Sequence, residues 1–132
     1  MSRIKSLVFL FIISLAGLQA QSDTLKFVPD GTDSDSVEYE LIVLDPGYEM
    51  YLATQPPKEF YTQAYYETWN TRYVSEWNYR HSNPLTFGDI YETYIDYSQN
   101  IDYGLELNYR LYHYFRFFEK ENGVDLLPER SR

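Results

Sequence analysis

The sequence predicts a single compact α+β domain in which two principal helices pack on a small sheet. Two long segments carry apolar residues at helical spacing, and one short segment rich in aliphatic residues ends at a turn signal. The chain has 132 residues, which is the length of one domain. We assign the globular domain to residues 38–127 and expect a frayed tail at residues 128–132.

The strand is expected at Glu38–Leu44, which reads EYELIVL and stops at the turn signal Asp45-Pro46-Gly47. Its centre is apolar at consecutive positions, which indicates that both faces are covered. A strand needs a partner, and the candidate partners are Ile90–Asp96 and Val124–Leu127.

The first long helix is expected from about Lys58 to Ser82. Pro56-Pro57 precedes it, and it stops before Asn83-Pro84 because the residue before a proline avoids the helical region. One or two further helical turns are expected at Tyr48–Thr54.

The second long helix is expected from about Asp102 to Asn122, followed by Gly123 as a C-terminal cap. Its apolar residues form one stripe: Leu107, Leu111, Tyr114, Phe115 and Phe118. The opposite face is expected to be polar and to carry His113, Arg116 and Lys120. Glu106 and Arg110 have the spacing of an ion pair one turn apart.

The first twenty residues have the order of a secretory signal peptide. Arg3 and Lys5 precede the apolar run Leu7–Leu18, and a small residue, Ala20, provides the cleavage position. The run is too short to span a bilayer, which needs roughly 20 residues, so an uncleaved anchor is the less favoured alternative. We therefore expect a signal peptide at residues 1–20, a flexible acidic leader at 21–37, no transmembrane segment in the mature chain, and a periplasmic or extracellular location.

Composition excludes several classes of function. The whole chain has a net charge of −9 and the mature chain −11, since the signal peptide carries two basic residues and no acidic ones. Such a charge repels nucleic acids. The absence of cysteine excludes disulfides, thiolate nucleophiles and a lipid-anchoring cysteine. The chain has two histidines without metal-ligand spacing, and we predict no metal site and no cofactor.

The first long helix carries the candidate site. Tyr66, Trp69, Tyr73 and Trp77 follow one another along one stripe, beside a polar row. An aromatic stripe at this spacing is most simply core, and Arg72, Glu76 and Arg80 are most simply a surface ion ladder. The functional interpretation is a ligand-binding groove formed by Gln63, Glu67, Asn70, Trp69, Tyr73, Trp77 and His81.

Three segments between Tyr39 and Leu127 resemble a family of small exported proteins of Bacteroidota, a domain of unknown function: YELIVLDPG, FYTQAYYETWNTRYVSEWNYRHSNP and YGLELNYRLYHYF. The resemblance implies a cell-envelope protein. It implies no activity and assigns no functional residue.

Two functions from different classes remain. The favoured one is a non-enzymatic binding module with an aromatic-rich surface, whose partner is an envelope protein or a glycan. The alternative is a small carbohydrate- or peptidoglycan-acting hydrolase, with Glu67 as a general acid whose pKa is raised by desolvation. The second carboxylate would then be Glu76, Glu92 or Asp96. The solvent exposure of the aromatic rings and of Glu67 distinguishes the two interpretations of this helix face. Exposed rings beside Glu67 would indicate a groove, whereas buried rings would indicate a core.

Overall fold

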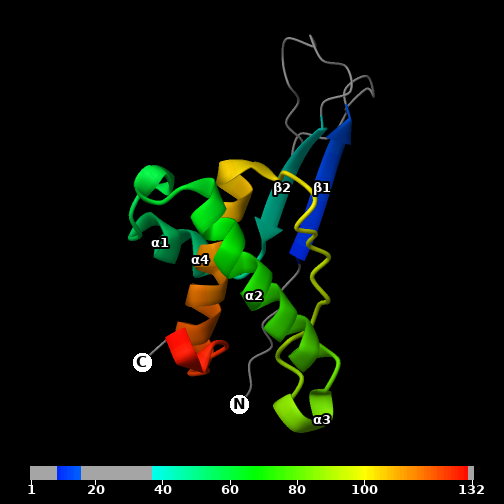
Figure 1. Ribbon diagram of the computed structural model, residues 1–132. Coiled ribbons are helices and arrows are strands. Elements are labelled where there is room, and N and C mark those ends of the chain that lie inside the picture. The colour runs from blue at the N-terminus through cyan, green and yellow to red at the C-terminus, as the bar shows by residue number, and fades with distance from the viewer. Residues whose placement is uncertain (1–8, 16–36, 131–132) are drawn as a thin grey trace.

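The computed structural model describes residues 9–15 and 37–130, with side chains from residue 39 onward (Figure 1). These residues are mostly helical, and the α-helices among them are α1 (Tyr48–Ala53), α2 (Gln63–His81), α3 (Pro84–Phe87) and α4 (Gly104–Asn122). Short 3-10 turns are η1 (Lys58–Phe60) and η2 (Pro128–Arg130). The strands are β1 (Phe9–Leu15) and β2 (Val37–Val43).

The two principal helices, α2 and α4, cross and pack against each other at the centre of the fold (Figure 1). Both were predicted, with small differences at their ends. α2 begins at Gln63 rather than Lys58, because the Thr62 hydroxyl accepts the Tyr65 N–H at 3.1 Å and caps the helix there. α4 ends where predicted, since Gly123 adopts φ 64°, which favours glycine.

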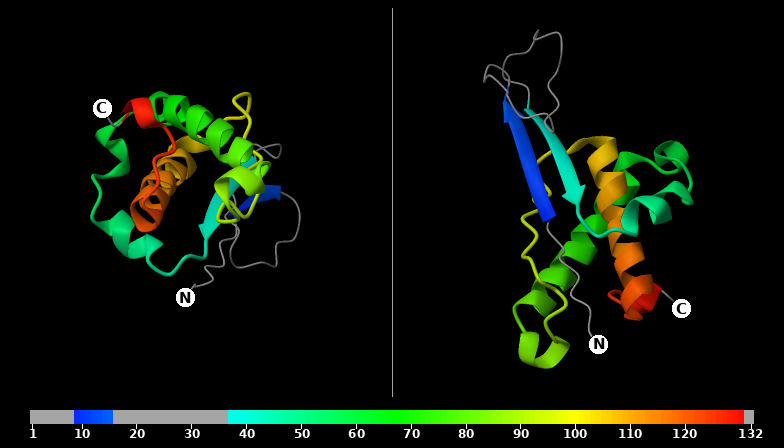
Figure 2. Two further views of the ribbon diagram at one scale, coloured as in Figure 1. Left: turned by 90° about the horizontal axis from the view of Figure 1, so that it is seen from below. Right: turned by 180° about the vertical axis from the view of Figure 1, so that it is seen from behind.

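α4 lies at the centre of the domain. It contacts α2, β2, α1 and η1, which lie around it in the view along its axis (Figure 2). Every residue of the predicted apolar stripe is buried: Leu107, Leu111, Tyr114, Phe115 and Phe118. Asn108, Tyr112, His113 and Phe117 are buried as well, so this helix is covered on nearly all sides rather than on one.

The expected sheet was wrong in its partners and in its role. β2 forms a two-stranded antiparallel ladder with β1, in a register that runs from Phe9↔Val43 to Leu15↔Val37. Neither Ile90–Asp96 nor Val124–Leu127 is a strand. The two helices pack mainly on each other, and β2 contacts the side of α4.

Side chains of α2 explain why residues 90–96 form no strand. Asn78 donates to the Ile95 carbonyl at 2.9 Å, and its own Oδ1 accepts the Ile95 N–H at 2.8 Å. The Trp77 indole donates to the Thr93 carbonyl at 2.7 Å. Because these backbone groups already have partners on a helix, the segment runs extended along α2 without joining a ladder.

The short turn η2 contacts both α2 and α4. It lies within residues 128–132, which were predicted to be a frayed tail. The Arg130 guanidinium lies 3.9 Å from the centre of the Trp69 ring and also donates to the Tyr112 hydroxyl. Arg72 pairs with Glu129 at 2.5 Å rather than with Glu76. Residues 131 and 132, the cleavage position and most of the predicted leader lie outside the described residues.

Leu111 provides a test of the central helix, because its side chain is fully buried in the middle of α4. Leu111→Ala should lower the free energy of unfolding by about 3–4 kcal/mol, through lost burial and the cavity left behind. Leu85→Ala is the matched control, since Leu85 is fully exposed on α3. It should change stability by less than about 0.5 kcal/mol in urea denaturation. Equal effects of the two substitutions would contradict the central position of α4.

Candidate functional site

Three of the predicted site residues on α2 are sealed in the core. Tyr73, Trp77 and Asn70 have no exposed surface. The Tyr73 ring stacks on Phe115 at 4.9 Å, and Trp77 packs edge-on against Phe118 at 4.7 Å. The predicted groove along this face was therefore wrong for these residues, because α4 and residues 91–95 cover it.

Asn70 is occupied by an internal polar network. Its amide donates to the carbonyl and to the side-chain oxygen of Asn108, at 2.9 and 3.1 Å. The Tyr97 hydroxyl donates to the same Asn108 oxygen at 2.7 Å, and Asn108 donates to the Gly104 carbonyl. Buried amides need such partners, so this network fixes α2 against α4 rather than a ligand.

Gln63 and Glu67 are half-buried near the start of α2. The Gln63 amide donates to Glu67 Oε2 at 2.9 Å and to Asp102 Oδ1 at 2.6 Å, and Asp102 also accepts the Gly104 N–H. This bridge links the beginnings of α2 and α4. The Glu67 side chain also lines the neighbouring cavity.

That cavity, here called the polar groove, has a volume of about 220 Å³ and lies between α2 and the loop that precedes α4. Glu67 is the one carboxylate among its described lining residues, which include Thr68, Thr71 and Tyr97. A second hollow of about 420 Å³ shares Thr71, Tyr97 and Gln99 with it and adds further hydroxyl and amide side chains.

Trp69 and His81 lie apart from the polar groove. Trp69 is half-buried between the guanidinium groups of Arg130 and Arg72, which lie 3.9 and 5.0 Å from its ring centre. His81 Nδ1 lies 2.8 Å from the Tyr91 carbonyl at the end of α2. The structure therefore distributes the seven predicted residues over several surroundings and does not bring them around one cavity.

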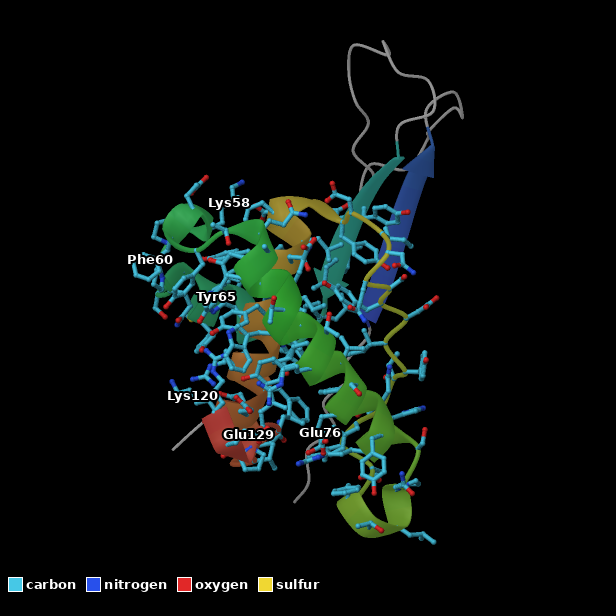
Figure 3. The ribbon with its side chains drawn as sticks, in the orientation of Figure 1. Lys58, Phe60, Tyr65, Glu76, Lys120 and Glu129 are labelled. Carbon is cyan, nitrogen blue, oxygen red and sulfur yellow. The ribbon has the colours of Figure 1, made fainter. Side chains whose placement is uncertain are left out.

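A different cavity combines aromatic and polar side chains. It has a volume of about 210 Å³ and is enclosed by α1, the segment that leads to η1, the start of α2, and α4. We call it the aromatic cavity, and its lining residues are Tyr51, Gln55, Pro56, Phe60, Tyr61, Tyr66, Tyr112, His113 and Arg116. Phe60 and Tyr65 mark this side of the molecule in Figure 3.

Aromatic packing shapes the rim of this cavity. Tyr61 stacks on Tyr65 with the ring centres 3.8 Å apart, and Phe60 meets Tyr61 edge-on at 4.8 Å. Phe60 and Tyr61 remain exposed, by 58% and 39%. Tyr66 is held deeper in the wall because its hydroxyl donates to the Lys58 carbonyl at 3.1 Å. The rim thus presents exposed aromatic surface to solvent, and its rings are held by contacts with one another.

The predicted position of His113 was wrong as well. It was expected on a polar face, yet it is buried, with its ring against Tyr109 at 4.7 Å and Tyr112 at 4.9 Å. Its Nδ1 has no hydrogen-bond partner among the described residues. Burial, and then the positive charges of Arg116 and Arg130, lower the pKa of His113 from 6.5 to about 4. The imidazole is therefore neutral at pH 7.

Arg116 supplies the charge of the cavity. Its Nη1 donates to the Tyr73 hydroxyl at 3.2 Å and to Glu119 at 3.3 Å. Glu119 is itself fixed by the Leu126 N–H, which it accepts at 2.9 Å. Burial raises the pKa of Glu119, while this hydrogen bond and Arg116 oppose the rise. The guanidinium is held at one nitrogen and remains partly exposed.

A family of unknown function, DUF6146, matches residues 4–128. The chain belongs to this family. No curated protein and no solved structure matches the chain. The DUF6146 match extends over both strands and all four α-helices described above, so it covers the aromatic cavity and the polar groove alike.

Two further properties of the described part of this DUF6146 chain bear on the site. No group of three or more His, Cys, Asp or Glu side chains in residues 39–130 is arranged to hold a metal ion. No described helix is long and apolar enough to cross a membrane.

His113 should make stability depend on pH. Its folded pKa of about 4 lies below its unfolded value of 6.5, so between these values the unfolded chain takes up a proton that the folded one does not. Stability should therefore fall by about 3 kcal/mol between pH 7 and pH 4 on account of this group, and its contribution should level off below pH 4.

The measurement is urea denaturation across this range. Carboxylates titrate in the same window, so the His113 contribution is the difference between the wild type and His113→Gln. The matched control is His81→Gln, which leaves His113 in place and should retain the steeper dependence. Identical pH profiles for the wild type and His113→Gln would contradict the buried neutral state.

Proposed function

We propose that this DUF6146 chain is an exported cell-envelope protein of Bacteroidota that binds a glycan without catalysing its hydrolysis. The observation that carries the proposal is the aromatic cavity, where five aromatic side chains surround an amide, an imidazole and a guanidinium. Ligand sites commonly combine a hydrophobic or aromatic lining with a few placed polar groups.

The lining suits a sugar ring better than a purely apolar ligand. A pyranose presents C–H groups on its faces, which pack on aromatic rings, and hydroxyls at its edge, which need hydrogen-bond partners. Tyr61 and Phe60 offer exposed rings at the entrance. Gln55 uses its amide nitrogen toward Tyr51 and Thr54, which leaves its carbonyl oxygen as an acceptor.

The hydrolase alternative gains no support from the position of Glu67. None of its three candidate partner carboxylates is among the lining residues of the polar groove. Glu76 forms an ion pair with Arg80 at 2.7 Å, and Glu92 and Asp96 are exposed on the segment after α3. A glycosidase of the common kind needs a second carboxylate at a set distance from the general acid, and Glu76, Glu92 and Asp96 do not supply one in this groove.

Export is supported by the N-terminal sequence. Cleavage after Ala20 would remove β1. Among the described elements, β1 packs mainly against β2. The packing of α2 on α4 does not involve β1, so the helical part and both cavities would persist in the mature protein.

Export has a direct test. When the full chain is expressed in a Bacteroidota host, the protein in the envelope or medium should begin at Gln21 by N-terminal sequencing. Ala20→Arg should block cleavage, because the peptidase requires a small residue before the cut. A protein that retains Met1 and stays in the cytoplasm would overturn the export proposal.

Binding at the aromatic cavity is tested with Tyr61→Ala. Protein-observed NMR titrations with soluble fragments of peptidoglycan and surface polysaccharide should show shifts around Tyr61, Tyr66 and Tyr112. Loss of the Tyr61 ring should weaken binding about tenfold, since one aromatic contact contributes about 0.5–1.5 kcal/mol beyond its buried area. Tyr79→Ala is the matched control, because Tyr79 is exposed by 57% near the other end of α2.

Two results would contradict this assignment. Absence of binding by every fragment would remove the glycan proposal. Binding that is unchanged in Tyr61→Ala but lost in Glu67→Gln would move the site to the polar groove.

A further inference from the structure

The charge of the aromatic cavity differs from that of the protein as a whole. The chain has a net charge of −9, with twenty acidic and eleven basic residues. Among the described residues that line the cavity, the one charged side chain is Arg116, a cation. Arg130 adds positive potential at the same place, because its charge acts on His113 in the cavity wall. Glu119 pairs with Arg116 at 3.3 Å and offsets part of this charge, but Glu119 does not line the cavity, so the charged side chain that faces the hollow is a cation.

The Arg116 guanidinium has donors to spare. Both of its hydrogen bonds within the described residues are made by Nη1, so Nη2 and Nε remain available. Tyr73 and Glu119 fix its position from the core side, which limits the side-chain entropy lost on binding a ligand. Adjacent guanidinium donors match the two oxygens of a carboxylate.

The other polar groups of the cavity are neutral. His113 carries one donor and one acceptor in its neutral form, and Gln55 offers its carbonyl oxygen. These groups suit hydroxyls rather than a second charge. A volume of about 210 Å³ is smaller than the cavities that hold drug-sized ligands and corresponds to a single substituted ring.

From this arrangement we infer that the aromatic cavity binds a carboxylate-bearing pyranose, such as a uronic acid residue of an acidic glycan, with its carboxylate on Arg116. The ring packs on Tyr61 and Phe60 at the entrance, and its hydroxyls face Gln55 and His113. The inference rests on the proposed glycan-binding function and specifies the substrate class of that same site.

The test compares two sugars that differ only in charge. Methyl β-D-glucuronide and methyl β-D-glucoside are titrated into the full mature protein and followed by NMR. The glucuronide should bind at least tenfold more tightly, and its advantage should shrink at high salt. Benzoate, a planar carboxylate without hydroxyls, is the third probe and should bind at least tenfold more weakly than the glucuronide.

Variants assign the preference to Arg116. Arg116→Gln should reduce the difference between glucuronide and glucoside to less than twofold. Arg116→Lys keeps the positive charge but lacks the two adjacent N–H donors of the guanidinium. It should retain part of the preference for the glucuronide. Arg72→Gln is the matched control, because Arg72 is paired with Glu129 and does not line the cavity, and it should keep the full preference. The comparison of sugars on the wild type stands even if a variant fails to fold.

Each contrary result has a distinct meaning. Equal binding of glucuronide and glucoside, dependent on Tyr61, would overturn this inference and leave the glycan-binding function standing. Benzoate binding as tightly as the glucuronide would overturn it in favour of a simple organic acid. A glucuronide preference that survives Arg116→Gln would place the carboxylate elsewhere and overturn it as well. Absence of binding by all sugars and all envelope fragments would remove the proposed function too.

Discussion

The burial of α4 on nearly all sides is the constraint on which the rest of this fold depends. A helix so rich in tyrosine carries polar atoms into the core, and most of these atoms need a hydrogen-bond partner there. The Tyr109 hydroxyl donates to the Pro56 carbonyl at 2.6 Å, and the Tyr48 hydroxyl donates to the Arg110 carbonyl. These bonds tie the segment from α1 to η1 onto α4. The same segment forms one wall of the aromatic cavity. The hydrogen bonds that the buried tyrosine hydroxyls require therefore also position this wall of the candidate site.

Helical periodicity predicted the parts of the fold that depend on local sequence. The stripe from Leu107 to Phe118, the stop at Gly123 and the break at Asn83-Pro84 all follow from spacing and backbone preference, and the structure has them. His113 shows where this reasoning fails. A helical projection assigns a side chain to solvent from its own polarity. The burial of His113 also depends on a residue far away in the sequence, Tyr66 of α2, whose ring centre lies 6.4 Å from that of the imidazole.

The site and the strand pairing were hard to predict for a related reason. Asn70 and Trp77 looked like groove residues because a polar row runs beside the aromatic stripe of α2. Their partners, Asn108 and the Thr93 carbonyl, lie on other segments that no spacing rule connects to them. Likewise, Asn78 binds the backbone of Ile95 and so removes a segment that looked like a strand. In each case, hydrogen bonds between segments far apart in the sequence determined the structure, and the local sequence pattern did not.

The two tryptophans of this chain have contrasting surroundings, which makes the protein its own spectroscopic probe. Trp77 is enclosed in the core and donates to a carbonyl, whereas Trp69 lies half-buried beneath Arg130 of η2. Detachment of the C-terminal turn would change the environment of Trp69 alone, and loss of the core would change both. Intrinsic fluorescence can therefore separate local opening of the C-terminal segment from global unfolding without any added label.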